Sequence, residues 1–199
     1  MSDSFNTTIN SSLKNILFPL LTSTGSILTG FYMLSLLIEN QIASSQIPGI
    51  LFIASGLSLS IFSVQNYKLI NGWGLYLLFG LLILLTGIYI TVSEPSVYVT
   101  GLASLLRSGI LLGAAWDLKK HEHADWGNIG IASITGLIFS VILIADPATL
   151  ELPVNFVMAA LFISTGIAGL LLYSELRKVN RFYGLLKKLT KSTKLVSIA

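Results

Sequence analysis

The residue with the clearest chemical potential is Arg107, which stands in the otherwise apolar or small run GLASLLRSGILLGAAW. A charge at the centre of an apolar helix inside a bilayer costs about 2.5–3.5 kcal/mol on insertion scales. In a helix, Thr100 and Ser104 share a face with Arg107, and no aspartate or glutamate lies at a comparable depth in any apolar run. These three residues form a candidate intramembrane polar site. Its role is either a structural hydrogen-bond hub or the lining of a path for an anion or a proton.

A second group of titratable side chains occurs in the polar stretch DLKKHEHADW. Its two histidines, His121 and His123, suit metal ligation or titration near about pH 6.5. However, an HxH pair in a short exposed loop has no fixed geometry and needs a third ligand from elsewhere. A solvated loop is therefore the preferred interpretation, with a pH sensor and a metal site as alternatives. We predict no metal ion and no cofactor.

Several kinds of chemistry are absent from the sequence. It has no cysteine, which excludes disulfides, iron–sulfur clusters, thiolate zinc sites and cysteine nucleophiles. It contains no P-loop, GxSxG or HExxH motif. It also lacks a pair of intramembrane carboxylates of the kind that proton-coupled transporters use. We therefore predict no catalytic residue and a protein that is not an enzyme.

The composition predicts an integral membrane protein. The 199 residues are 53% hydrophobic and only 11% charged, whereas a soluble domain carries about 25% charged residues. A bilayer core needs roughly 20 apolar residues as a helix, and six such blocks predict an all-α, six-helix membrane bundle. Its spans are residues 16–38, 47–64, 73–92, 96–116, 127–145 and 152–173, between an N-terminal segment 1–15 and a tail 174–199. The alternative is a cleaved signal peptide at 16–38, which leaves five spans.

The charges of the loops predict the orientation. Apart from Arg107, every lysine and arginine lies before the first span, in the second or fourth loop, or in the tail. Because cytoplasmic loops retain Lys and Arg, we expect both termini on the cytoplasmic side of the inner cell membrane. The loops of the opposite face carry only acids, which lose their charge on acidification. These candidate pH-responsive acids are Glu39, Glu94, Asp146 and Glu151.

The later spans contain an internal repeat. Trp73-Gly74 recurs as Trp126-Gly127, and the turn SEPS at residues 93–96 recurs as ADPA at 145–148. Each unit has Trp-Gly at the inner surface, a span with glycine, an acid-Pro turn outside and a returning span. The first two spans fit this pattern loosely. We therefore predict three transmembrane helical hairpins in parallel orientation.

The repeated segments GWGLYLLFGLLILLTGIYITVSEP (72–95) and DWGNIGIASITGLIFSVILIADP (125–147), each followed by a glycine-bearing span, resemble the HdeD family of acid-resistance membrane proteins. The resemblance covers about residues 16–173 and is carried mainly by the last two hairpins. It implies a bacterial or archaeal cytoplasmic membrane protein linked to acid or general stress. It implies no established cofactor or active site.

Two further patterns concern contacts with other molecules. The tail SELRKVNRFYGLLKKLTKSTK has apolar residues at intervals of three and four with basic residues between them, which predicts an amphipathic helix on anionic inner-leaflet lipids. A partner-protein site is the alternative, and no nucleic-acid motif accompanies the charge. Gly109-x-x-x-Gly113 predicts a close helix contact inside the bundle. Its alternative is a subunit interface of a homo-oligomer.

These observations leave three hypotheses for function. The leading one is a non-enzymatic protein of the HdeD type that contributes to acid or envelope-stress tolerance. The second is a small channel or transporter for an anion or small solute, in which Arg107 lines the path. The third is a membrane scaffold or assembly subunit.

Overall fold

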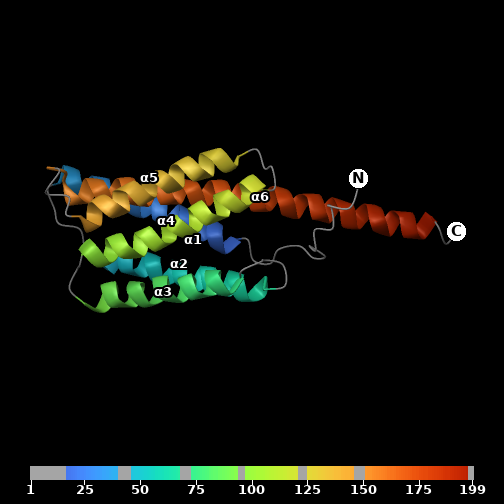
Figure 1. Cartoon of the computed structure of the whole chain (residues 1–199), viewed down its shortest axis with the longest axis horizontal. Helices are drawn as coiled ribbons and strands as arrows, with labels where there is room; N and C mark the ends of the chain where they lie inside the picture. Colours follow the sequence, from blue (N-terminus) through green and yellow to red (C-terminus); the bar gives the residue numbers. More distant parts are fainter. Residues whose placement is uncertain are drawn as a thin grey trace.

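The computed structural model describes residues 17–39, 46–67, 73–93, 97–120, 125–145 and 151–196. All of the regular structure in these ranges is helical (Figure 1). Six helices are each long and apolar enough to cross a membrane, so the chain is a multi-pass membrane protein. They are α1 Leu17–Ile38, α2 Gln46–Gln65, α3 Trp73–Val92, α4 Val97–Lys120, α5 Trp126–Ile144 and α6 Val154–Val196.

The last helix is longer than the sequence predicts. The sixth span was expected to end at residue 173, but α6 continues as one helix of 43 residues to Val196. Its final part extends beyond the other helices (Figure 1). The tail is thus a continuation of α6 and not a separate helix, and Gly184 does not interrupt it. Whether its apolar residues share a face against lipid stays a prediction, because most of those side chains lie outside the described ones.

The helices pack most extensively as the pairs α2–α3, α4–α5 and α1–α6. The three hairpins expected from the repeat, α1–α2, α3–α4 and α5–α6, are therefore not the principal packing units. Of these, only α5–α6 is an extensive contact. The large contact of α1 with α6 makes α1 a structural part of the bundle.

Glycines explain why α2 and α3 form the closest pair. Gly49 and Gly56 on α2 are seven residues apart, as are Gly80 and Gly87 on α3, so each pair lies on one stripe of its helix. A Cβ at Gly56 would lie 2.7 Å from the Gly80 carbonyl oxygen, and one at Gly87 would lie 3.0 Å from the Gly49 carbonyl oxygen. The two backbones are therefore in direct contact, the arrangement that holds helices together in lipid.

The pairs α4–α5 and α1–α6 also have a glycine on one helix close to the backbone of the other, but no glycine faces a glycine there. On α4, a Cβ at Gly101 would lie 3.3 Å from the Ser140 carbonyl oxygen of α5. On α1, a Cβ at Gly30 would lie 3.0 Å from the Ala159 carbonyl oxygen of α6. Small residues thus select the partner of each helix. If one repeat unit is α2–α3 and the next is α4–α5, the two units coincide with two of the extensively packed pairs, unlike the predicted hairpins.

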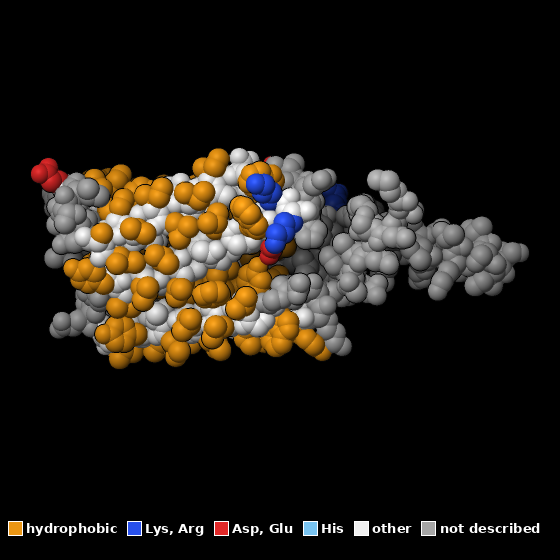
Figure 2. All heavy atoms as spheres, viewed as in Figure 1, with side chains coloured by type: hydrophobic (Ala, Val, Ile, Leu, Met, Phe, Trp, Pro, Cys, Tyr) orange, Lys and Arg blue, Asp and Glu red, His pale blue; other side chains and the backbone are white. Residues whose placement is uncertain are grey.

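An apolar core joins the α2–α3 pair to the rest of the bundle. The rings of Phe52 on α2 and Phe162 on α6 are both fully buried, and their centroids lie 5.8 Å apart. Met33 of α1 and Ile83 of α3 belong to the same buried cluster. The outer surface is apolar too, and Figure 2 shows hydrophobic side chains over the visible flank of the bundle. This surface suits lipid.

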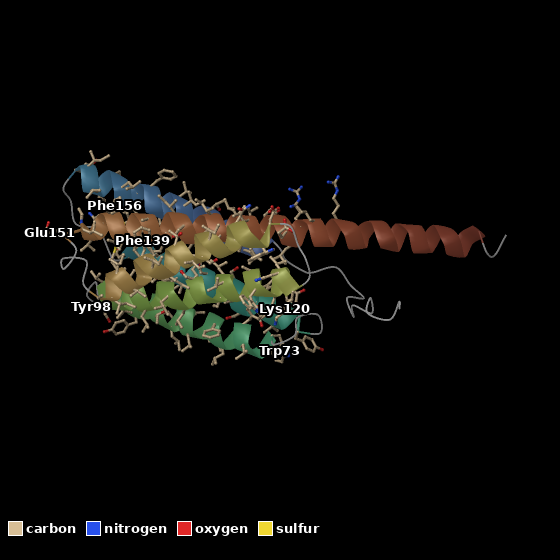
Figure 3. The ribbon with its side chains drawn as sticks, turned by 45° about the horizontal axis from the view of Figure 1, so that its top comes forward. Trp73, Tyr98, Lys120, Phe139, Glu151 and Phe156 are labelled. Carbon is tan, nitrogen blue, oxygen red and sulfur yellow. The ribbon has the colours of Figure 1, made fainter. Side chains whose placement is uncertain are left out.

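The two ends of the bundle differ in charge. Lys120 and Trp73 lie at one end, and Glu151 and Tyr98 lie at the other (Figure 3). We call these the basic end and the acidic end. The side of the membrane that each end faces stays a prediction from the loop charges.

The glycine pair of α4 does not make the predicted internal contact. Gly109 and Gly113 are both exposed, and a Cβ added at either would meet no atom within 4 Å. The prediction of a contact inside the bundle is therefore wrong, because these glycines lie on the flank opposite the packed face of α4. A subunit interface there stays a prediction.

Alanine at Gly56 tests the helix contact. We expect Gly56→Ala to lower the free energy of unfolding by about 1–3 kcal/mol, as overpacking does. The added Cβ would lie 2.5 Å from the Leu84 amide nitrogen, and backbone cannot move aside cheaply. The measurement is thermal unfolding of the purified protein in lipid nanodiscs. Gly109→Ala is the matched control and should leave stability equal or about 0.5–1 kcal/mol higher, since alanine favours helix. Equal losses in both variants would contradict this account.

Candidate functional site

Arg107 is buried in the middle of the bundle, with 8% of its surface exposed. Its Nη1 donates a hydrogen bond to the Ser26 hydroxyl over 3.1 Å, and its Nη2 donates one to the Thr22 carbonyl oxygen over 3.4 Å. Both acceptors belong to α1, which is not one of the helices packed extensively against α4. The long side chain of Arg107 therefore connects two helices whose backbones stay apart.

Ser26 passes this connection on to α6. Its hydroxyl donates a hydrogen bond to the Phe162 carbonyl oxygen over 2.8 Å, and it lies 3.4 Å from the Thr165 hydroxyl. Because a hydroxyl both donates and accepts, Ser26 can receive Arg107 and bind Phe162 at the same time. One serine thus couples α4, α1 and α6, and none of its surface is exposed.

The two predicted neighbours of Arg107, Thr100 and Ser104, lie on the same helix, but neither accepts one of its described hydrogen bonds. Thr100 and Ser104 are both buried on the packed face of α4. The Ser104 hydroxyl has no hydrogen-bond partner among the described residues, and neither has the Ser108 hydroxyl. Thr22 and Ser26 of α1 were not among the predicted partners of Arg107. The buried small polar residues of α1 were the available signal, but nothing in the sequence tells which helix faces Arg107.

More hydroxyl groups gather where α4, α5 and α6 meet. A Cβ at Gly136 of α5 would lie 2.8 Å from the Ser108 hydroxyl, 2.8 Å from the Thr165 methyl group and 3.4 Å from the Ser164 hydroxyl. Thr165 is also the neighbour of Ser26, so these groups adjoin Arg107. We call this set the polar centre: Ser26, Ser104, Arg107, Ser108, Ser164 and Thr165.

The polar centre has no acidic member. The carboxylates that the structure describes belong to Glu39, Asp117, Asp125, Glu151 and Glu175. The first four lie at or near helix ends, and Glu175 lies near the end of the membrane-spanning part of α6, Val154–Lys178. The described ranges also contain no group of three His, Asp or Glu residues that could hold a metal ion. His121 and His123 fall outside those ranges. The centre is thus a buried cation among neutral hydroxyl and carbonyl groups.

Two of the four candidate pH-responsive acids can be placed. Glu151 is exposed at the acidic end (Figure 3). Glu39 is exposed directly after Ile38, the last residue of α1, and α1 ends on that same side of the bundle (Figure 1). Glu151 has a φ of 54°, a left-handed conformation in the turn that leads into α6. The other two, Glu94 and Asp146, lie outside the described residues.

Lys178 organises the basic end. Its ammonium group donates to the Asp125 carboxylate over 2.7 Å and also to Glu175, which is 2% exposed. These contacts tie the start of α5 to α6. The hydrogen bond from Lys178 lowers the pKa of Asp125 below its usual value. Nearby, the Lys119 ammonium lies 5.0 Å from the Trp116 ring centroid and 4.7 Å from that of Trp126, within cation–π range.

No protein-family model, curated protein or solved structure matches this chain. The resemblance to the HdeD family therefore stays a prediction from the repeat.

Ser26→Ala tests the coupling through Arg107. We expect a loss of about 1.5–3 kcal/mol in the free energy of unfolding, the usual worth of a hydrogen bond to a charged group. Arg107→Met should cost less, because no carboxylate pairs with Arg107 and none is left as an unpaired charge. In the double variant, the added cost of Ser26→Ala should shrink. A double-mutant cycle of thermal unfolding measures this, and strictly additive effects would contradict the coupling.

Asp125→Asn tests the contact at the basic end through its pH dependence. A lowered folded pKa means that ionised Asp125 stabilises the fold fully above its usual value of 3.8, and less as the pH falls through the lower folded value. We expect wild type to be more stable than Asp125→Asn by the same amount at pH 5 and pH 7, and the difference to shrink below pH 3.8. Glu151→Gln, at the other end, is the control. A difference that stays constant down to pH 2 would refute the assignment.

Proposed function

We propose that this chain is a non-enzymatic membrane protein of the cytoplasmic (inner) cell membrane that contributes to acid or envelope-stress tolerance, as HdeD-family proteins do. The observation that carries the proposal is the separation of charge between the two ends. Glu39 and Glu151 are exposed at the acidic end, whereas the described basic side chains outside the polar centre lie at the other. Since Lys and Arg stay on the cytoplasmic side, the acidic end faces the exterior.

The acids supply a mechanism for a response to external pH. Near neutral pH, ionised carboxylates on short neighbouring loops repel one another. The predicted loops of this face also contain Glu94 and Asp146, so the repulsion involves at least three connections. Protonation removes it and allows tighter packing or association at the outer face. The response thus needs no catalytic residue and no cofactor.

The basic tail supplies an anchor to anionic lipids in this proposal. Arg177, Lys178 and Arg181 are exposed where α6 leaves the bundle. The rest of the helix continues to Val196, and its final 18 residues measure roughly 27 Å at 1.5 Å per residue. In a straight α6, only the residues nearest the bundle reach lipid headgroups. Anchoring of the whole tail therefore requires a bend after the span.

Deletion of the gene in its host tests the function. We expect survival after exposure to low external pH to fall about tenfold or more, while growth near neutral pH is unchanged. Expression of the wild-type protein should restore survival. A variant in which Glu39, Glu94, Asp146 and Glu151 are all replaced by their amides should also restore survival, because neutral amides mimic the protonated carboxyl groups. The pH dependence of its thermal stability should be weaker than that of wild type, because those side chains carry no charge to lose.

The matched control replaces Asp117 at the basic end by asparagine, and it should restore survival and keep the wild-type pH dependence of stability. Membrane abundance of each variant is measured in parallel, so that loss of protein is not taken for loss of response. Unchanged survival of the deletion strain at low pH would overturn the proposal. A four-amide variant that fails to restore survival at wild-type abundance, or that keeps the wild-type pH dependence of stability, would overturn the role of the acids.

A further inference from the structure

We infer that the polar centre binds a small inorganic anion of about the size of chloride, between α1, α4, α5 and α6. This inference does not depend on the proposed role in stress tolerance. It rests on the charge of Arg107, on two unpartnered hydroxyls beside it and on the convergence of four helices there.

The first argument is the uncompensated charge. Arg107 has five N–H donors, and its two described hydrogen bonds reach the Ser26 hydroxyl and the Thr22 carbonyl oxygen. Both acceptors are neutral. Buried charges in membranes normally pair with an opposite charge, yet no carboxylate of the sequence lies near the middle of a span. An anion from solution supplies the missing charge.

The second argument is the kind of group that lacks a partner. The Ser104 and Ser108 hydroxyls are buried without a hydrogen-bond partner in the described part of the chain. They stand three residues before and one residue after Arg107 on α4. A guanidinium offers only donors, and a hydroxyl can offer one. A ligand that binds all three groups must accept hydrogen bonds and need not donate any. An anion meets this requirement better than a cation or an amine does.

Two other hydroxyls also lack partners, and they help to place the site. Ser55 and Ser60 belong to α2, which does not pack extensively against α4. Ser60 lies in a different contact, the one with α3, where a Cβ at Gly80 would lie 2.6 Å from the Ser60 hydroxyl. Only the pair on α4 belongs to the helix that carries the buried charge.

The third argument concerns size. Ser108, Ser164 and Thr165 converge on Gly136, where even a methyl group would press on Ser108 and Thr165 at 2.8 Å. Every member of the polar centre is less than 9% exposed. Because a chloride ion is no smaller than a methyl group, the ion lies at the Arg107 guanidinium and not against Gly136. Close packing around the guanidinium favours a compact, monovalent ion over a bulky oxyanion. It also keeps water from screening the attraction between the ion and Arg107.

Chloride binding to the whole protein in lipid nanodiscs tests the inference. Thermal unfolding is followed while chloride replaces gluconate at constant ionic strength, and the concentration dependence yields an apparent Kd. In wild type, the unfolding temperature should rise with chloride and saturate. Arg107→Gln should weaken the apparent affinity about tenfold or more, since a charge-assisted hydrogen bond is lost. Arg177→Gln, an exposed arginine outside the bundle, is the matched control and should bind as wild type does.

A second variant keeps the test decisive if Arg107→Gln does not fold. Replacing Ser104 and Ser108 together by alanine retains the charge and should weaken chloride binding by about threefold to tenfold. Formate is titrated in parallel. No chloride-dependent rise in wild type, or the same rise in Arg107→Gln, would overturn the inference. Tighter binding of formate than of chloride would also overturn it, because the site would then take carboxylates.

Discussion

Direct contact between helix backbones is the constraint on which the rest of this bundle depends. Lipid tails are as apolar as leucine, so hydrophobic burial does not drive membrane helices together. Close approach does, and it requires small residues at matching heights. Gly56 facing Gly80 meets this requirement between α2 and α3, and Gly30 facing Ala159 meets it between α1 and α6. The pairing of helices follows from where such residues lie, and only secondarily from which helices are consecutive.

Arg107 depends on that pairing. The contacts of α4 with α5 and of α1 with α6 set α4 and α1 at a separation that only a long side chain can cross. Arginine crosses it and ends on the Ser26 hydroxyl. The Ser104 and Ser108 hydroxyls, on shorter side chains of the same helix, have no hydrogen-bond partner among the described residues. The polar centre is thus a product of helix spacing as much as of residue type.

The sequence predicts much of the local structure and little of the packing. Apolar blocks and polar breaks placed five of the six spans within a few residues of the observed helices, because bilayer thickness sets helix length. The pairing of helices was not predictable from the repeat. Each span can form a hairpin either with the span before it or with the span after it, and the repeat fits both choices. Gly109 and Gly113 misled for a related reason: spacing shows that two residues share a face, but not what that face meets. Arg107 was recognised from its type, whereas its acceptor Ser26, on a distant helix, was not.

The contact of the first span with the last has a consequence for biosynthesis. Helix α1 enters the membrane early, yet its extensive partner, α6, is the last of the six described spans to be made. Until then Gly30 has no facing Ala159, and the Ser26 hydroxyl has no Phe162 carbonyl to bind. The growing chain is therefore an open arc, and insertion of α6 closes it into a ring of packed helices. A chain that stops short exposes hydroxyls of α1 to lipid, a state that quality-control proteases of the membrane can distinguish from the finished protein.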